Sequence, residues 1–287
     1  MKVWIDGRVV DGPEARVPVT DHGLLYGDGV FEGIRIYGRR VFRLDDHLRR
    51  IQVSAAAIAL TIPGGTRHLQ EIVLETARAF GADDAYVRLL VTRGEGALGV
   101  DPTTCPRPRV VCIVDDVRIY PPEKLERGIA LVTVSLRRPQ SDVLDPRVKS
   151  LNYLNNALAK LEARQRGADE ALMLNGSGAV AEASVANVFA VKCGRLTTPP
   201  PSDGALEGIT RRTVLELAAR EGVAAEERTL DRVDLLGADE VFLTGTGARI
   251  VPVGSLDGQA IGDGSRPTTE RLAALFAAFA RTAGTPL

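Results

Sequence analysis

The sequence predicts an α+β protein built in two parts. Short runs rich in β-branched residues are separated by turn residues and therefore read as hairpins, and the amphipathic helices do not alternate strictly with strands. The proline pair Pro121–Pro122 interrupts the pattern, because it can continue neither a central strand nor a helix interior. We expect a small N-terminal domain over residues 1–118, a linker over 119–126 and a larger domain over 127–287.

The first part is predicted to contain hairpins and two helices. Gly7 and Gly38 each stand between two short β-rich runs, which indicates tight turns. Apolar residues at steps of three and four then predict two helices, the first stopping before Pro63 and the second ending at Gly81. In order, we expect strands at 2–6, 9–10, 34–37 and 41–43, helices at 44–58 and 66–80, and strands at 85–92 and 110–114.

The second part is predicted to start with a strand at 129–135 and to carry further hairpins. Their turns are expected at Asn175–Gly176 and at Gly194. Three helices are expected from apolar periodicity, one ending near Gly167, one ending at Gly222 and one near the C-terminus. Their apolar positions are, in order, Leu151, Leu154, Leu158 and Leu161; Val214, Leu217 and Ala218; and Leu272, Leu275, Phe276 and Phe279.

Composition and charge exclude several classes of protein. Lys and Arg number 36 against 37 Asp and Glu, and this net charge of −1 provides no basic surface for nucleic acid or for an anionic membrane. No run approaches the ~20 apolar residues that a membrane span requires, and the first residues lack a signal peptide's apolar stretch, so we expect a cytoplasmic protein. The widely spaced Cys105, Cys112 and Cys193 predict neither a disulfide framework nor a metal site.

Lysine is scarce, which leaves few candidates for an amine nucleophile. The chain has five lysines, and Lys149 differs from the others because it follows a polar, turn-rich stretch and immediately precedes a helix. A lysine at such a junction can point into a cleft, where burial or neighbouring cations lower its pKa and free the amine to form a Schiff base. A solvated surface charge is the competing interpretation.

One carboxylate stands out in the sequence. Glu182 lies in GAVAEASVANVFAV, between two runs that each read as a buried strand. A carboxylate is costly to bury unless it is paired with a cation, and a protonated pyridine nitrogen would be one such partner. A glutamate at a strand end facing water is the alternative.

Two segments could receive an anion. In LEGITRR, Gly208 allows a close backbone approach while Ile209 and Thr210 stand where a helix begins, so free amides and the helix dipole would attract phosphate. Thr210 could equally be a simple helix cap. In TGTGARIVPV, Thr244, Gly245, Thr246 and Gly247 form a small-residue turn between two strands, although hairpin turns often look like this without binding anything.

Several further side chains could bind substrate or phosphate. Arg49 and Arg50 lie beside the apolar stripe of the first helix, where either could reach a phosphate or simply face solvent. Tyr86 and Arg88 share one face of a strand because they are two residues apart, and they could offer a phenol and a guanidinium to a carboxylate. A solvated sheet face would show the same alternation. Tyr26 and Phe31 are the nearby aromatic candidates.

In order along the chain, these segments resemble the fold-type IV family of pyridoxal-phosphate enzymes, and most closely branched-chain amino acid aminotransferases. The resemblance runs from about Trp4 to Gly258. It is carried by YGDGVFEGIRIY, HLRRI, YVRLLVTRGEGALGVDP, VKSLNYLNN, AEASVANVFAV, LEGITR and FLTGTGARIVPV. It implies a D-amino acid aminotransferase-like fold with a small N-terminal α/β domain and a larger C-terminal domain with a β-barrel-like core.

The resemblance implies a role for each candidate residue. Lys149 would be the lysine bound to the cofactor, and Glu182 would face its pyridine nitrogen. The remaining cofactor contacts would be Arg50, Tyr153, Ile209, Thr210 and Thr246. The substrate pocket would be lined by Tyr26, Phe31, Tyr86 and Arg88, with Thr246, Gly247 and Ala248 receiving the substrate carboxylate. Tyr26 would reach the site of a neighbouring subunit, which implies a homodimer or a higher homo-oligomer.

The implied activity is transfer of the amino group of Leu, Ile or Val to 2-oxoglutarate with pyridoxal 5'-phosphate as cofactor and no metal. A D-amino acid aminotransferase and an aminodeoxychorismate lyase of the same fold are the alternatives. RGEGALGVDP and the absence of His after His68 disfavour the D-specific enzyme. Two departures from the family pattern remain: Tyr153 follows Lys149 by four positions, and Gly247 and Arg249 replace the Ala and Glu of many relatives. We expect Arg249 to face solvent.

Overall fold

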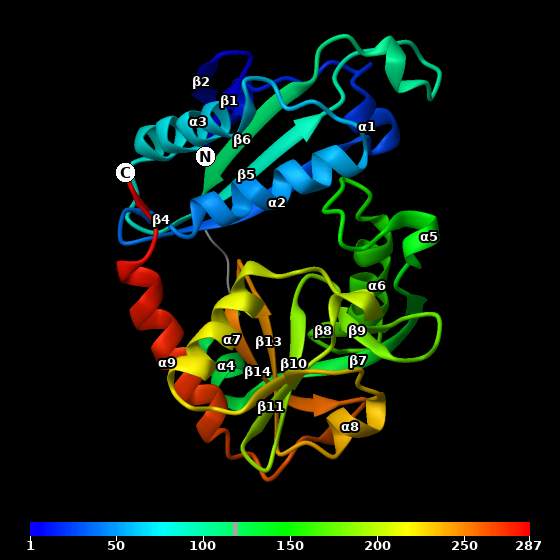
Figure 1. Ribbon diagram of the computed structural model, residues 1–287, viewed down its shortest axis with the longest axis vertical. Coiled ribbons are helices and arrows are strands. Elements are labelled where there is room, and N and C mark those ends of the chain that lie inside the picture. Colours follow the sequence, from blue (N-terminus) through cyan, green and yellow to red (C-terminus); the bar gives the residue numbers. More distant parts are fainter. Residues whose placement is uncertain (117–119) are drawn as a thin grey trace. The chain divides into compact units, whose positions relative to one another are not determined.

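The computed structural model describes residues 1–116 and 120–287. The chain divides into two compact units (Figure 1). Unit 1 comprises Met1–Arg118, Val148–Asn152 and Ala280–Leu287, and unit 2 comprises Ile119–Arg147 and Tyr153–Phe279. The boundary expected between residues 118 and 119 falls on residues 117–119, which lie outside the described residues. Most of the segment expected to be a linker belongs to a short helix, α4 (Pro122–Arg127).

Unit 1 is built on a seven-stranded sheet with the order β16-β4-β3-β5-β6-β1-β2. Every strand and helix expected in this part is present, within a few residues of its expected bounds. The strands are β1 (Lys2–Ile5), β2 (Arg8–Asp11), β3 (Gly29–Tyr37), β4 (Arg40–Val41), β5 (Ala85–Thr92), β6 (Arg109–Asp115) and β16 (Thr285–Pro286). The helices are α1 (His22–Tyr26), α2 (Leu44–Ala57) and α3 (Gly65–Phe80), with 3-10 turns at Gly12–Glu14 and Pro102–Thr104.

Helices α2 and α3 cover one face of this sheet (Figure 1). Their apolar stripes pack on alternate residues of the strands, among them Val87, Leu89 and Val91 of β5. Because side chains alternate along a strand, Tyr86 and Arg88 of β5 project from the opposite face. The shared face that the sequence predicts for these two side chains is therefore confirmed.

Unit 2 is built on a nine-stranded sheet. Eight of its strands follow the order β12-β11-β10-β13-β14-β7-β8-β9, and the ninth, β15, pairs with β14. The strands are β7 (Ile129–Arg137), β8 (Glu170–Leu174), β9 (Val180–Ala183), β10 (Asn187–Lys192), β11 (Arg195–Thr198), β12 (Ala225–Glu227), β13 (Glu240–Gly245), β14 (Arg249–Leu256) and β15 (Gln259–Ala260). The helices besides α4 are α5 (Ser141–Leu144), α6 (Leu154–Gln165), α7 (Ile209–Arg220), α8 (Arg232–Leu236) and α9 (Pro267–Thr282), and Pro201–Asp203 forms a 3-10 turn.

The sheet of unit 2 encloses an apolar core, to which β7, β8, β9, β10, β13 and β14 all contribute, and a second core cluster lies between α6 and strands β7 and β8. Both expected hairpins are present, since β8 pairs with β9 and β10 pairs with β11. The expected α+β class is thus confirmed. Across the described ranges, no helix is both long and apolar enough to cross a bilayer.

Helix α6 buries a different face from the one its leucines suggest. Ala159 and Ala163 pack against β7 and β8, whereas Leu154, Leu158 and Leu161 are 70%, 42% and 52% exposed. Alanine allows the helix to approach the sheet closely, and the larger side chains point outward. The helix itself was predicted correctly, but its leucines do not form the core.

Two segments that the sequence assigned to the large domain belong to unit 1. Val148–Asn152 lies beside β3, where Val30 and Ser150 form an antiparallel bridge. At the C-terminus, β16 pairs with β4 and adds the edge strand of the sheet. Both placements arise from pairing between residues far apart in the chain.

Candidate functional site

Lys149 is fixed through its backbone in unit 1. Its carbonyl accepts a hydrogen bond from the Phe31 N–H at 3.0 Å, and its own N–H donates to Ser54 Oγ of α2 at 3.1 Å. Two residues further on, the Leu151 N–H donates to the Gly29 carbonyl at 2.9 Å. The segment therefore holds a fixed register against β3, and Lys149 is partly buried.

Two cations gather at one aromatic ring of unit 1. Lys149 Nζ lies 4.4 Å from the centroid of the Phe31 ring, and the Arg88 guanidinium carbon lies 4.7 Å from that centroid. Arg88 also lies 5.4 Å from the centroid of the Tyr86 ring. Tyr86 extends over Gly33, where a Cβ would come within 2.1 Å of the Tyr86 hydroxyl. Four of the predicted residues thus form one cluster that combines an amine, a guanidinium and apolar ring surface.

Behind this cluster, Glu32 of β3 holds Arg50 of α2. The two side chains form a fork, with Arg50 Nε 2.7 Å from Oε1 and Nη2 2.6 Å from Oε2. His47 Nδ1 lies 2.7 Å from the same Oε2. Burial acts to raise the pKa of Glu32, but the charges and hydrogen bonds of Arg50 and His47 outweigh it and hold that pKa at about 2. Glu32 is therefore ionised, and it fixes the predicted phosphate-binding arginine.

The pKa of His47 responds to several neighbouring charges. Burial lowers the pKa of His47 below its ordinary value; the attraction of Glu32 opposes that shift, and the charges of Arg50 and Lys149 add to it. Arg49, the other candidate on α2, is 72% exposed and pairs with Asp46. The solvent-facing alternative therefore describes Arg49 but not Arg50, which is 13% exposed.

Sequence reasoning missed Glu32 and His47. The sequence did contain a signal for Glu32, because this glutamate stands among apolar residues in GVFEGIRIY. A glutamate buried in such a strand needs a cation, and the structure shows that β3 is buried along its whole length. His47 and Arg50 are three residues apart and thus share a face of α2, which made them the available partners.

In unit 2, Glu182 lies within β9 and is buried. Arg138 Nη2 lies 2.8 Å from its Oε1. Its Oε2 accepts hydrogen bonds from Asn187 Nδ2 and from the Leu206 N–H, both at 3.1 Å. The alternative of a glutamate that faces water is wrong, because one cation and two neutral donors hold this carboxylate inside the unit. Arg138 and Asn187 are further residues that the sequence analysis missed.

The first turn of α7 lies at the segment in which an anion cradle is predicted. Gly208 is the N-cap, and no side-chain hydrogen bond caps the helix among the described residues. A Cβ at Gly208 would lie 1.9 Å from Asn187 Oδ1, so only glycine fits there. Ile209 and Thr210 are buried as the first two helical residues, and Thr210 is therefore not the cap that the alternative interpretation made it. The free N–H groups of this turn remain available to an anion.

Beside Asn187, β13 contributes an orphaned hydroxyl. Thr244 is the cross-strand neighbour of Asn187, and within the described chain its buried Oγ1 has no hydrogen-bond partner. A buried hydroxyl without a partner is costly unless a ligand completes it. The hydroxyl and the helix turn together fit a phosphate group, which accepts hydrogen bonds at several oxygens.

The remaining candidates are half-buried or exposed. Thr246, Gly247 and Ala248 form the turn between β13 and β14, and Tyr153 stands immediately before α6. Tyr26 ends α1, is 36% exposed and donates a hydrogen bond to the Leu98 carbonyl. Arg249 is partly buried, with an inaccessible Nε atom, so it is less exposed than expected. The structure thus provides one cluster of predicted residues in unit 1 and another in unit 2.

The amino-transferase class IV family model matches residues 29–256. This match covers both clusters and most of the chain. The chain belongs to the amino-transferase class IV family. The family matches the fold-type IV resemblance seen in the sequence segments, which is therefore confirmed.

Three proteins illustrate how similar this aminotransferase is to known members. A putative branched-chain-amino-acid aminotransferase of Methanocaldococcus jannaschii is 49% identical over 261 residues, which cover 91% of this chain and 90% of the relative. The branched-chain aminotransferase of Thermoproteus uzoniensis, solved with norvaline, has a TM-score of 0.91 and 39% identity over 98% of this chain and 95% of that one. The Escherichia coli branched-chain amino acid aminotransferase has a TM-score of 0.94 and 34% identity over 99% of this chain and 95% of that one.

Proposed function

We propose that this aminotransferase uses pyridoxal 5'-phosphate to move the amino group of branched-chain L-amino acids to 2-oxoglutarate. The observation that carries the proposal is the cluster in unit 1, where Lys149 and Arg88 both lie against the Phe31 ring. An amine can accept and return a proton, a guanidinium can hold a carboxylate, and a ring can contact an aliphatic side chain. Relatives named as branched-chain enzymes support the same assignment.

The residues divide the work according to their chemistry. When bound, the cofactor supplies the carbonyl that takes the amino group and a pyridine ring that accepts electrons. Lys149 would move a proton at its Nζ atom, and Glu182 would keep the ring nitrogen of the cofactor protonated. Arg50, Ile209, Thr210 and Thr246 would bind the phosphate, and Tyr153 would orient the ring. These roles rest on the family pattern and on the fit of the α7 turn and of Thr244 to a phosphate.

Substrate recognition requires one pocket for two kinds of side chain. Phe31, Tyr26 and Tyr86 provide apolar surface for Leu, Ile or Val, while Arg88 binds the second carboxylate of 2-oxoglutarate. Thr246, Gly247 and Ala248 bind the α-carboxylate through backbone amides. Arg88→Gln should therefore lower kcat/KM for 2-oxoglutarate roughly 10–100-fold more than for a branched 2-oxo acid. Equal losses for both acceptors would refute this role of Arg88.

The experiment that tests the function is a substrate panel on the purified, cofactor-loaded enzyme. L-Leucine and L-isoleucine should bleach the visible absorbance of the cofactor and form glutamate when 2-oxoglutarate is present. Preference for D-alanine would indicate the D-specific enzyme instead, and pyruvate release from aminodeoxychorismate without an acceptor would indicate the lyase. A protein that cannot be loaded with pyridoxal phosphate would refute the proposal.

We also propose that the enzyme is a cytoplasmic homodimer whose subunits share Tyr26. In unit 1, Leu24 is close to Tyr26 in the sequence, and Tyr26 donates a hydrogen bond to the Leu98 carbonyl; these two leucines are 62% and 75% exposed. In unit 2, the leucines of α6 form a second exposed apolar face. A second copy of the chain would cover such surface. Sedimentation of the wild type as a monomer at micromolar concentration would refute the dimer.

A further inference from the structure

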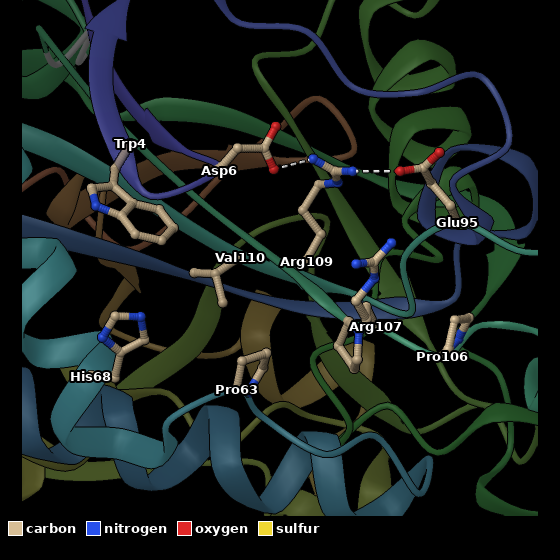
Figure 2. Close-up of a pocket in the computed structure, with 10 residues that line it drawn as sticks. Trp4, Asp6, Pro63, His68, Glu95, Pro106, Arg107, Arg109 and Val110 are labelled. Carbon is tan, nitrogen blue, oxygen red and sulfur yellow. Dashed lines mark hydrogen bonds and ion pairs between the residues drawn. The ribbon is translucent and has the colours of Figure 1, made fainter.

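A separate cavity of about 480 Å³ opens in unit 1 (Figure 2). None of the residues assigned to the cofactor or to the amino acid lines it. Its size lies within the range of small-molecule sites, which measure roughly 300–1,000 Å³. The cavity therefore has room for a ring of six to ten atoms with a short substituent, and nothing in the proposed transamination uses it.

One side of the cavity is apolar (Figure 2). Trp4 of β1, Val110 of β6 and Pro63, before α3, gather there. His68 of α3 fixes the Trp4 ring edge-on, with centroids 5.8 Å apart and planes at 79°. Trp4 is only 9% exposed, so its indole is held rigidly as part of the wall. A flat apolar group can pack against this surface without rearranging it.

The other side of the cavity is polar, and most of its charges are already paired. Arg109 pairs with three carboxylates: it bonds Asp6 through Nη1 and Glu95 through Nη2 at 2.9 Å (Figure 2), and its Nε lies 3.5 Å from Asp21 Oδ2. These acidic side chains share one guanidinium, and they would repel a ligand that carries several negative charges. Nucleotides and diphosphates are therefore poor candidates.

Arg107 is the one cation left on this side. Among the residues that the structure describes, it forms no ion pair and no side-chain hydrogen bond, although it lines the cavity next to the Arg109–Glu95 pair (Figure 2). Its backbone packs closely on Gly94, where an added Cβ would lie 1.9 Å from the Arg107 carbonyl oxygen. A guanidinium in this setting is suited to a single carboxylate, which it can bind with two parallel hydrogen bonds.

We propose that this cavity binds a small organic acid with one carboxylate and one flat apolar ring. The carboxylate pairs with Arg107, and the ring packs against Trp4, Pro63 and Val110. Arg107 can hold one carboxylate, and the rigid indole wall favours a planar body. Binding does not depend on the proposed transaminase activity, since the ligand needs neither Lys149 nor the cofactor.

The test uses the cofactor-loaded enzyme and a ring-fluorinated phenylacetate, which has no amine and forms no imine. Trp4 is the only tryptophan of the chain, so its fluorescence reports on the cavity wall directly, and fluorine NMR follows the ligand. We expect saturable binding with a Kd of about 1 mM, as a ligand of this size allows. Arg107→Gln should weaken binding of the acid roughly tenfold or more. Fluorinated benzyl alcohol, which lacks the carboxylate, should bind the wild type about as weakly as the acid binds Arg107→Gln.

Arg195→Gln is the matched control, because it removes an exposed arginine from unit 2 and should leave the Kd unchanged. Arg107 is exposed, so its loss should not alter the melting temperature. Three outcomes would overturn the proposal: no saturation with the wild type, equal affinity for the acid and the alcohol, or unchanged affinity in Arg107→Gln.

Discussion

The two units each bury a glutamate against an arginine, but they surround it differently. In unit 1, both oxygens of Glu32 contact the Arg50 fork, and His47 bonds one of them as well. In unit 2, Glu182 contacts one cation, Arg138, through one oxygen and two uncharged donors through the other. Glu32 thus positions the Arg50 guanidinium, whereas Glu182 is itself held in position by the groups around it.

This difference suggests that the two glutamates have different roles. A carboxylate locked by a fork contributes a fixed arginine, and the arginine in turn can bind phosphate. A carboxylate that meets one cation through one oxygen and neutral donors through the other is fixed in place, where it could face a cationic partner such as a protonated pyridine nitrogen. We infer that changes at Glu32 act on cofactor affinity and that changes at Glu182 act on turnover.

The largest effect on activity is expected at Lys149, the predicted nucleophile, whose Nζ lies against the Phe31 ring in unit 1. Lys149→Ala should lower transamination by more than about 10⁴-fold, because the same amine binds the cofactor and transfers the proton. Single-turnover measurements with L-leucine check this. Lys192→Arg, at a lysine that pairs with Asp239 at the surface, should behave as the wild type. Substantial activity in Lys149→Ala would remove the lysine from the mechanism.

The next largest effects should separate the two glutamates. Glu32→Gln should raise the Kd for pyridoxal phosphate roughly 10–100-fold, since Arg50 loses a charged partner, while kcat at saturating cofactor stays close to the wild-type value. Glu182→Gln should do the reverse and lower kcat with little change in cofactor affinity. Both variants should be destabilised by about 3 kcal/mol, because each leaves a buried arginine poorly paired. Identical effects on affinity and turnover would contradict the comparison.

Acid stability should also depend on Glu32. Its pKa is lowered from 4.5 to about 2 in the folded chain. A depressed carboxylate pKa stabilises the fold fully above the unfolded value, and the stabilisation is lost as pH falls from about 4.5 towards 2. The loss should amount to about 3 kcal/mol. Denaturant titrations across this range measure it, and Glu32→Gln should show a correspondingly weaker pH dependence.

The smallest effect is expected at Gly33. Alanine would bring its Cβ to 2.1 Å from the Tyr86 hydroxyl, so the tyrosine must move away from the strand. We expect KM for the amino donor to rise roughly tenfold and stability to fall by about 1–3 kcal/mol, the usual range for overpacking. Gly99→Ala adds the same methyl group where nothing lies within 4 Å and should change neither quantity.

Local patterns predicted most of the fold. The helices α2 and α3 and the hairpins around Gly7 and Gly38 follow from periodicity and turn chemistry, which act over a few residues. The alternation of β5 likewise predicted that Tyr86 and Arg88 share a face. Lys149 was singled out by its place between a turn-rich stretch and a helix, and its contact with Phe31 could not be read from that position.

What escaped prediction depends on distant pairs. Nothing near Val148–Asn152 indicates that it pairs with β3, because the partner strand precedes it by more than a hundred residues. The outward face of α6 depends on how closely Ala159 and Ala163 approach the sheet, which no helical pattern encodes. The partners of Glu32 and Glu182 were missed for the same reason. The neighbouring sequence shows that each glutamate needs a cation, but the arginine that supplies it lies far away in the chain.

The chain passes between the two units four times, at residues 118–119, 147–148, 152–153 and 279–280. Unit 1 is therefore discontinuous, and its five-residue insert carries the only lysine expected to react. During synthesis, unit 1 stays incomplete until residue 152 has been made, and its edge strand β16 is added only with residues 285–286. Expressing residues 1–116 separately would yield a sheet that lacks both Lys149 and the edge strand β16. No single cut therefore divides the enzyme into two independent units.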